Sequence, residues 1–126
     1  RPTPVQRPRP PSWVVGAWPR PTSMARALRY DGILPYFIEP DGSQGEGTPE
    51  RYAELAAYIS AHRTEPGPYE IVVEGTTPAD DPAAAAAHVR PFAEAGGTWW
   101  VESPWTPPTE VEHLRRRIAA GPPRVD

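Results

Sequence analysis

Cysteine and lysine are absent from this 126-residue chain, and methionine occurs only once. Without cysteine the chain forms neither disulfides nor thiolate metal sites, which suits a reducing compartment, and we expect a cytoplasmic protein. No apolar run approaches the ~20 residues of a membrane span, and no signal peptide is visible. The net charge of −3 disfavours a surface for nucleic acid or an anionic membrane, and we expect neither as a partner.

Proline, in contrast, is abundant, with 20 residues in this chain against a usual share of about 5%. Residues 1–11 are rich in Pro and Arg and cannot form a helix or a central strand. We interpret them as an extended lead-in, and residues 12–126 as the folded unit. The chain begins with Arg1 and its only methionine is Met24, so we expect a segment of a longer protein.

Four short segments rich in β-branched or aromatic residues alternate with helical patterns. The predicted strands are 12–17, 31–37, 69–75 and 98–103, and the predicted helices are 22–30, 49–63, 82–95 and 107–120. Thr48 and Asp81 are typical N-caps, each followed by proline. In the last helix we expect Val111, Leu114 and Ile118 to face inward. Strands that are joined by helices run parallel.

Four βα units without a fifth fit half of a barrel better than a doubly wound sheet. A doubly wound nucleotide fold would carry a Gly-x-Gly-x-x-Gly turn after a strand, and none follows any strand here. The Gly-rich segment 42–47 has no lysine and includes Glu46, so we interpret it as a flexible loop and not as a phosphate cradle. The sequence predicts an α/β fold, the (βα)4 half of a TIM-type (βα)8 barrel, with parallel strands each followed by a helix.

The first and last predicted strands would be open edges of such a half-barrel. We expect a missing N-terminal half-barrel or a second copy to close the ring. On its own, the segment is expected to dimerise, aggregate or be marginally stable.

Barrel enzymes build their sites at the carboxyl ends of the strands, which defines a set of candidate residues. These are Gly16, Ala17, Trp18, Arg20, Pro35, Tyr36, Phe37, Glu74, Gly75, Thr76, Glu102, Ser103 and Trp105. Either Gly16 and Ala17 offer backbone N–H groups to a phosphate, with Arg20 as counter-charge, or they only form a tight turn. Side-chain alternation predicts that Glu74 and Glu102 project together into the barrel mouth, as a site pair or within a salt-bridge network.

The histidines do not indicate a metal site. His62, His88 and His113 lie singly on the predicted helices with no partner at ligand spacing, so we expect no metal. No residue of this segment is assigned a catalytic role.

The stretch "PVQRPRPPSWVVGAWPR…MARALRYDGILP" resembles the second half of luciferase-like monooxygenases, which are flavin- or deazaflavin-dependent (βα)8 oxidoreductases. The matching residues are Gly16-Ala17, Arg26-Ala27-Leu28 and Asp31-Gly32, and the later "EAGGTWWVES" is similar to the last strand of the family. The likeness covers roughly residues 4–123. The second glycine of the family's Gly-Gly pair is replaced by Ala17, and the acidic Glu39 stands where some relatives carry a basic residue.

The resemblance implies the C-terminal portion of a luciferase-like oxidoreductase, an enzyme only as part of a longer parent chain. The segment would hold the phosphate of FMN or of a deazaflavin coenzyme (F-420), and it would wall part of the cleft for a small organic substrate. The implied cofactor residues are Gly16, Ala17, Trp18, Arg20 and Tyr36, and the implied cleft residues are Glu74, Glu102 and Trp105. The alternatives are a non-catalytic half-barrel or assembly partner, and a phosphosugar-processing barrel that uses the two glutamates.

Overall fold

The computed structural model describes residues 5–104 and 111–125. Strands and helices alternate along the chain, and within the described residues all strands are parallel and pair in chain order, β1-β2-β3-β4. The elements are β1 (Trp13–Trp18), α1 (Pro21–Ala27), β2 (Gly32–Phe37), α2 (Pro49–His62), β3 (Glu70–Gly75), α3 (Pro82–Glu94), β4 (Trp99–Glu102) and α4 (Val111–Ala120). The predicted alternation and the α/β class are confirmed. The start of the last predicted helix, 107–110, lies outside the described residues.

The predicted helix starts are also confirmed by their hydrogen bonds. The Thr48 hydroxyl accepts from the N–H of Arg51, and the Asp81 carboxylate accepts from the N–H of Ala84 at 2.9 Å. In both helices proline follows the cap. An N–H at this position would have no acceptor within the helix, so its absence in proline costs no hydrogen bond. None of the described helices is long and apolar enough to cross a membrane.

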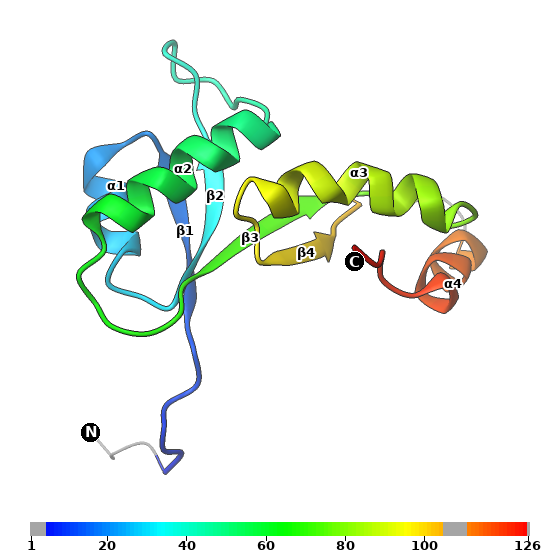
Figure 1. Ribbon diagram of the computed structural model, residues 1–126, viewed down its shortest axis with the longest axis horizontal. Coiled ribbons are helices and arrows are strands. Elements are labelled where there is room, and N and C mark those ends of the chain that lie inside the picture. The colour runs from blue at the N-terminus through cyan, green and yellow to red at the C-terminus, as the bar shows by residue number, and fades with distance from the viewer. Residues whose placement is uncertain (1–4, 105–110, 126) are drawn as a thin grey trace.

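The helices α1, α2 and α3 cover one face of the sheet. When parallel strands lie side by side in chain order, right-handed crossovers place all the connecting helices on the same face of the sheet. The strands of this sheet follow that order throughout. Figure 1 shows α2 crossing β1 and β2, with α3 beside β3 and β4. The buried core lies between these layers and consists of Met24, Ala27, Leu28, Ile33, Phe37, Tyr52, Leu55, Ile59, Ile71 and Val73.

The opposite face of the sheet has no covering layer among the described residues. Val15 is 56% exposed there and Trp99 is 51% exposed. Trp13 and Trp99 lie on the two outer strands, which would stand about 14 Å apart in a flat sheet of four strands. Their ring centroids are nevertheless 5.2 Å apart. The sheet therefore bends toward its uncovered face at the amino ends of the strands.

The expectation that α4 buries an apolar stripe is wrong. None of its residues is buried, and Val111 and Ile118 are 67% and 79% exposed. Figure 1 shows α4 beyond the carboxyl end of β4, at the far end of the molecule from α1. The amphipathic period identified the helix correctly, but it carries no information on whether a partner surface exists within this chain.

The described part of the lead-in is held against the sheet by Asp31. Between residues 5 and 11 the chain forms no helix or strand. The Arg9 guanidinium donates to both carboxylate oxygens of Asp31, at 2.6 and 3.0 Å, and the N–H of Ser12 donates to the same carboxylate. These bonds, led by the one from Arg9, lower the pKa of Asp31. The Asp31-Gly32 pair therefore has a structural role at the amino end of β2.

Candidate functional site

The turn between β1 and α1 borders an open depression of about 1030 Å³. The N–H of Arg20 donates to the carbonyl of Ala17 at 2.9 Å, and Pro21 then begins the helix. The residues that line the depression are Ala17, Arg20, Pro21, Thr22, Ser23, Ala25, Arg26 and Arg29. Of the predicted cofactor residues, Ala17 and Arg20 therefore lie together at this site.

The depression is positively charged. It is lined by Arg20, Arg26 and Arg29, and no Asp or Glu of the described residues lines it. One Arg26 nitrogen donates to the carbonyl oxygen of Val15 at 2.8 Å. Because this acceptor is neutral, the hydrogen bond does not compensate the positive charge of the guanidinium. The sequence analysis missed Arg26 and Arg29 as site residues. Their i, i+3 spacing, next to a strand end that already carries Arg20, is a signal that points to them.

The backbone amide of Ala17 is not bare. It donates to the Oγ of Ser23 at 2.9 Å. The strand and helix patterns of the sequence did not predict this hydrogen bond. Since Ser23 accepts here through its oxygen, its own O–H remains available as a donor to the depression. A ligand oxygen at this position would accept a hydrogen bond from the Ser23 hydroxyl, or it would replace Ser23 as the acceptor of the Ala17 N–H.

Gly16 is buried and faces the helix layer. A Cβ at this position would overlap the Ile33 side chain and come close to Ala27. The glycine is thus explained by the close approach of β2 and α1, and it does not line the depression.

The two aromatic candidates lie on opposite faces of the sheet. Trp18 packs against the core and meets Tyr58 edge-on, with ring centroids 5.1 Å apart. Tyr36 pairs in register with Ala17, so it lies on the uncovered face, and it is exposed. Trp105 lies outside the described residues.

The prediction that Glu74 and Glu102 form a pair is wrong. Glu74 stands opposite Val101 in the strand register, and Glu102 stands opposite Gly75. Because cross-strand neighbours share a face and successive residues alternate, the two carboxylates point to opposite sides of the sheet. Alternation within each strand did not fix the register between the strands.

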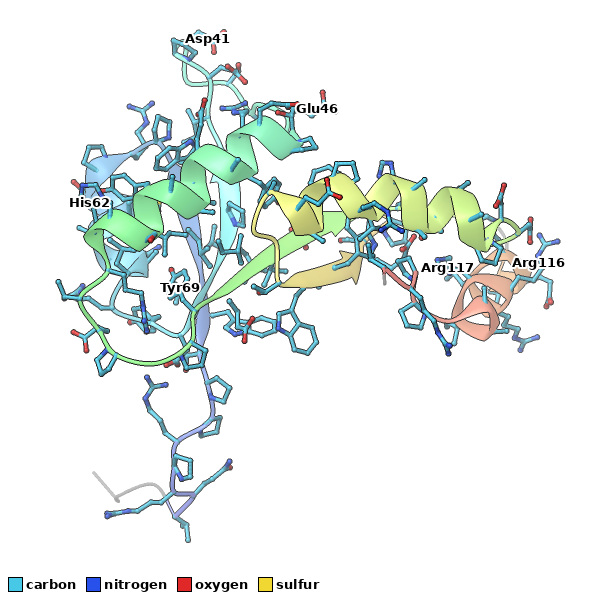
Figure 2. The ribbon with its side chains drawn as sticks, viewed as in Figure 1. Asp41, Glu46, His62, Tyr69, Arg116 and Arg117 are labelled. Carbon is cyan, nitrogen blue, oxygen red and sulfur yellow. The ribbon has the colours of Figure 1, made fainter. Side chains whose placement is uncertain are left out.

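Glu102 instead belongs to a network that joins β4, the loop before α3, and α4. Its carboxylate accepts from the N–H of Thr77 at 2.6 Å, the Thr77 hydroxyl at 2.9 Å and the Trp100 ring N–H at 3.1 Å. The Arg117 guanidinium lies 3.3 Å away, and Figure 2 shows Arg117 nearer than Arg116 to the end of β4. Burial raises the pKa of Glu102, but the hydrogen bonds from Arg117, Thr77 and Trp100 outweigh it and leave the pKa lowered.

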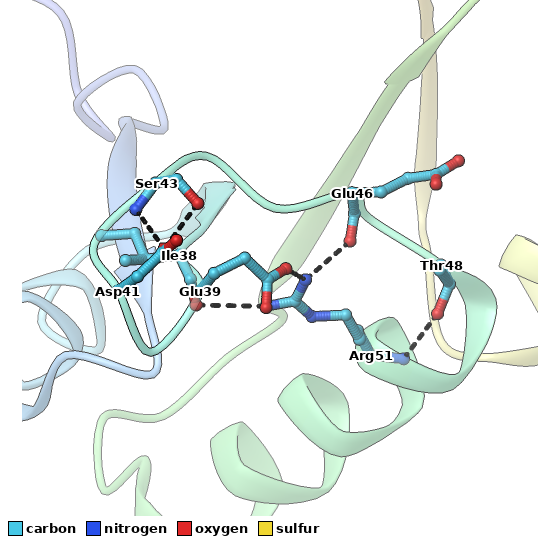
Figure 3. Close-up of polar contacts among 7 residues, drawn as sticks. All are labelled: Ile38, Glu39, Asp41, Ser43, Glu46, Thr48 and Arg51. Carbon is cyan, nitrogen blue, oxygen red and sulfur yellow. Dashed lines mark hydrogen bonds and ion pairs between the residues drawn. The ribbon is translucent and has the colours of Figure 1, made fainter.

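The loop between β2 and α2 is organised by Arg51, a residue that the sequence analysis did not single out. Arg51 donates to the Glu39 carboxylate at 2.7 Å and to the carbonyl oxygens of Glu46 and Ile38, as Figure 3 shows. Its guanidinium also lies over the Phe37 ring, 4.9 Å from the centroid. The segment predicted to be flexible is therefore held by specific contacts, and the Glu39 charge is neutralised.

The tip of this loop is closed by a second set of bonds. The Asp41 carboxylate accepts from the N–H of Ser43 at 2.9 Å and from its hydroxyl at 2.6 Å, and these bonds lower the pKa of Asp41. Figure 2 places Asp41 at the far tip of the loop.

The histidines contact aromatic rings. His62 stacks on Tyr58 with centroids 4.1 Å apart, and His88 meets Trp100 edge-on at 5.5 Å. Within residues 5–104 and 111–125, no group of three or more acidic or histidine side chains is placed to hold a metal ion.

Comparisons with models of known protein families, with curated proteins and with solved structures returned no match. The likeness to luciferase-like monooxygenases thus rests on the sequence motifs.

Proposed function

We propose that this chain is the C-terminal half of a luciferase-like (βα)8 oxidoreductase, and that it holds the phosphate end of FMN or of a deazaflavin coenzyme. The observation that carries the proposal is the arginine-lined depression at the carboxyl end of β1, beside Ala17 and Arg20. The bound cofactor would supply the hydride or oxygen chemistry, and the chain would bind and orient it.

The donors around the depression fit a phosphate group. Arg20 and Arg26 supply guanidinium N–H groups, and Thr22 and Ser23 supply hydroxyls at the start of α1. Because the Ala17 amide already donates to Ser23, we infer that the phosphate oxygens are met first by the serine hydroxyl and the guanidinium groups. In the family motif, by contrast, the phosphate is bound by the free backbone amides of the glycine pair.

The uncovered face of the sheet supports the second part of the proposal, which is that another half-barrel completes the cleft. Four parallel strands in chain order, with their helices on one face, are the arrangement that four more βα units would extend into a closed ring, provided that Arg26 and Ser23 release the Val15 carbonyl and the Ala17 amide on the free edge of β1. The exposed Tyr36 and Trp99 lie on the face that would then line the interior. A small organic substrate would bind in the cleft that the two halves share.

The test compares two ligands that differ by the phosphate alone. FMN and riboflavin are titrated against the chain at low salt, with flavin fluorescence as the readout. We expect FMN to bind about tenfold more tightly than riboflavin, because charge-assisted bonds are lost without the phosphate. Arg20→Gln should remove most of this preference and leave the weak binding of riboflavin unchanged.

Arg116→Gln is the matched control, since Arg116 is an exposed arginine on α4, far from the depression. It should leave the preference for FMN intact. Equal affinities for FMN and riboflavin in the wild type would contradict the proposal.

A second candidate function is a non-catalytic half-barrel that acts as an assembly partner. Two observations favour it: the Ala17 amide is already occupied by Ser23, and packing against Ile33 accounts for Gly16 without a ligand. This function predicts no preference for FMN over riboflavin, so the same titration separates the two candidates.

A further inference from the structure

Two apolar surfaces of this chain lack a partner among the described residues. One is the uncovered face of the sheet, where Val15 and Trp99 are more than half exposed, although parallel sheets are ordinarily covered on both faces. The other is the apolar stripe of α4, formed by Val111, Leu114 and Ile118. Exposed apolar patches of this kind mark interaction surfaces.

A positive charge lies beside the apolar stripe of α4. Val111, Leu114, Arg115 and Ile118 follow the i, i+3, i+4, i+7 spacing that places residues on one face of a helix. The Arg115 guanidinium contacts the Glu112 carboxylate at 3.6 Å, and both side chains are exposed. Such a surface pair contributes little to stability, so Arg115 remains available to an acidic partner.

A negative charge lies on the uncovered face of the sheet. The strand register places Glu70 and Glu74 on this face, and none of the paired strand residues on it is an arginine. Glu74 is exposed and stands opposite Val101, and among the residues that the structure describes its carboxylate contacts only the Ser103 hydroxyl, at 3.5 Å. This face therefore offers apolar side chains beside an unpaired carboxylate, which complements the α4 stripe with its arginine.

The helix α4 is held away from the uncovered face of its own sheet. Arg117 binds Glu102 at 3.3 Å, and Glu102 points to the opposite side of the sheet from Glu74. Figure 1 shows α4 beyond the carboxyl end of β4. While this ion pair is kept, an α4 helix that covers the face comes from another molecule.

We propose that two copies of this chain form a reciprocal dimer, in which the α4 stripe of each copy packs on the uncovered sheet face of the other and Arg115 pairs with Glu74. This twofold exchange covers both apolar surfaces in both copies. Two sheet faces stacked directly on each other would instead bring the glutamates of both copies together without counter-charges, which is unfavourable.

The dimensions of the two surfaces agree. The helix α4 has 10 residues, which span about 15 Å at a rise of about 1.5 Å per residue, and the outer strands of a flat four-stranded sheet stand about 14 Å apart. The contact between Trp13 and Trp99 narrows the uncovered face at the amino ends of the strands. The partner helix therefore lies toward the carboxyl ends, where Tyr36, Glu74 and Val101 are located.

This inference goes beyond the proposed function, because it concerns the chain on its own and needs no flavin. The other half-barrel of a longer parent chain would compete with the second copy for the same face.

Sedimentation velocity over a range of concentrations measures the dimer dissociation constant of the wild type and of charge variants. Arg115→Glu and Glu74→Arg should each weaken the dimer by at least about tenfold, because each brings like charges together. The double variant, Arg115→Glu with Glu74→Arg, reverses the pair and should restore the affinity to within about threefold of the wild type. Such a rescue requires that the two side chains meet across the interface.

Two further variants keep the test specific. Arg116→Glu is the matched control, because Arg116 lies two residues after Leu114 and therefore on the opposite side of α4. It should leave the dimer constant unchanged. Ile118→Thr interrupts the apolar stripe and should weaken the dimer by about tenfold. The thermal melt of the dilute monomer should not change, because Ile118 is 79% exposed.

Several results would overturn the inference. They are a wild type that stays monomeric, equal losses in Arg115→Glu and Arg116→Glu, or a double variant that is no stronger than the single ones. If Val15→Thr with Val101→Thr weakens the dimer but Arg115→Glu and Ile118→Thr do not, the sheet faces associate without α4 and the inference is also wrong.

The outcomes separate this inference from the proposed function. If FMN is preferred over riboflavin but the reversed charge pair does not rescue the dimer, the inference is wrong and the proposed function stands. If the reversed pair rescues the dimer but FMN and riboflavin bind alike, the dimer stands and the flavin proposal is wrong.

Discussion

At the scale of single residues, Gly16 shows how one residue type serves different purposes. A glycine at a strand end suits a tight turn, a bare amide for a phosphate, or the close approach of a neighbour. In the structure the third reason applies, because Ile33 of β2 occupies the space that a Cβ would need. No local pattern distinguishes these reasons, since the neighbour comes from another strand.

Gly16→Ala should therefore destabilise the fold by about 1–3 kcal/mol through overpacking. Ile33→Val removes one of the overlapping atoms and alone should cost about 0.5–1.5 kcal/mol. The double variant should be more stable than the sum of the two changes predicts. Urea unfolding of the four proteins measures this coupling, and strict additivity would show that the two side chains do not compete for space.

At the scale of elements, the Glu102 carboxylate connects three parts of the chain. Thr77 comes from the loop before α3, Trp100 from β4 itself and Arg117 from α4. Since α4 buries no residue of its own, this network is a main contact between α4 and the rest of the described chain.

The lowered pKa of Glu102 predicts a sensitivity to acid. The ionised carboxylate stabilises the fold above its unfolded pKa of about 4.3, and this contribution is lost as the pH falls through the lower folded pKa. Glu102→Gln should cost about 1–3 kcal/mol at neutral pH, because charged hydrogen bonds are lost. The difference between wild type and variant should shrink below pH ~4.

Urea midpoints measured for both proteins from neutral to acidic pH test this. Glu74→Gln is the control, because Glu74 is exposed on the opposite face and should change the stability little. A constant difference between wild type and Glu102→Gln at all pH values would mean that the charge of Glu102 does not matter.

At the scale of the whole molecule, the sheet has an uncovered face and two outer strands. Part of the free edge of β1 is occupied by α1, since Arg26 donates to the Val15 carbonyl and Ser23 accepts the Ala17 amide. The large apolar side chains Val15, Trp99 and Val101 remain exposed. Exposed apolar groups next to strand edges favour association.

The chain should accordingly associate as its concentration rises, which sedimentation velocity measures directly. Val15→Thr together with Val101→Thr should weaken the association, because both side chains lie on the uncovered face. Val5→Thr is the matched control, since Val5 is fully exposed in the lead-in. A protein that stays monomeric at every concentration would contradict this prediction.

What the sequence determined by itself was local. Thr48 and Asp81 begin helices because a cap needs only its own first turn, and the four strands follow from short apolar runs between breakers. Parallel pairing followed as well, because each connection contains a helix. The class of fold was therefore accessible without coordinates.

Only the tertiary structure decided which groups meet. The strand register separated Glu74 from Glu102, and no surface of the described residues covers the apolar stripe of α4. The placement of Arg26 and Arg29 in one depression with Ala17 likewise depends on how α1 turns back beside β1. Such contacts join residues that are distant in the sequence, and the hydrophobic period of a single helix or strand carries no information on which other element packs against it.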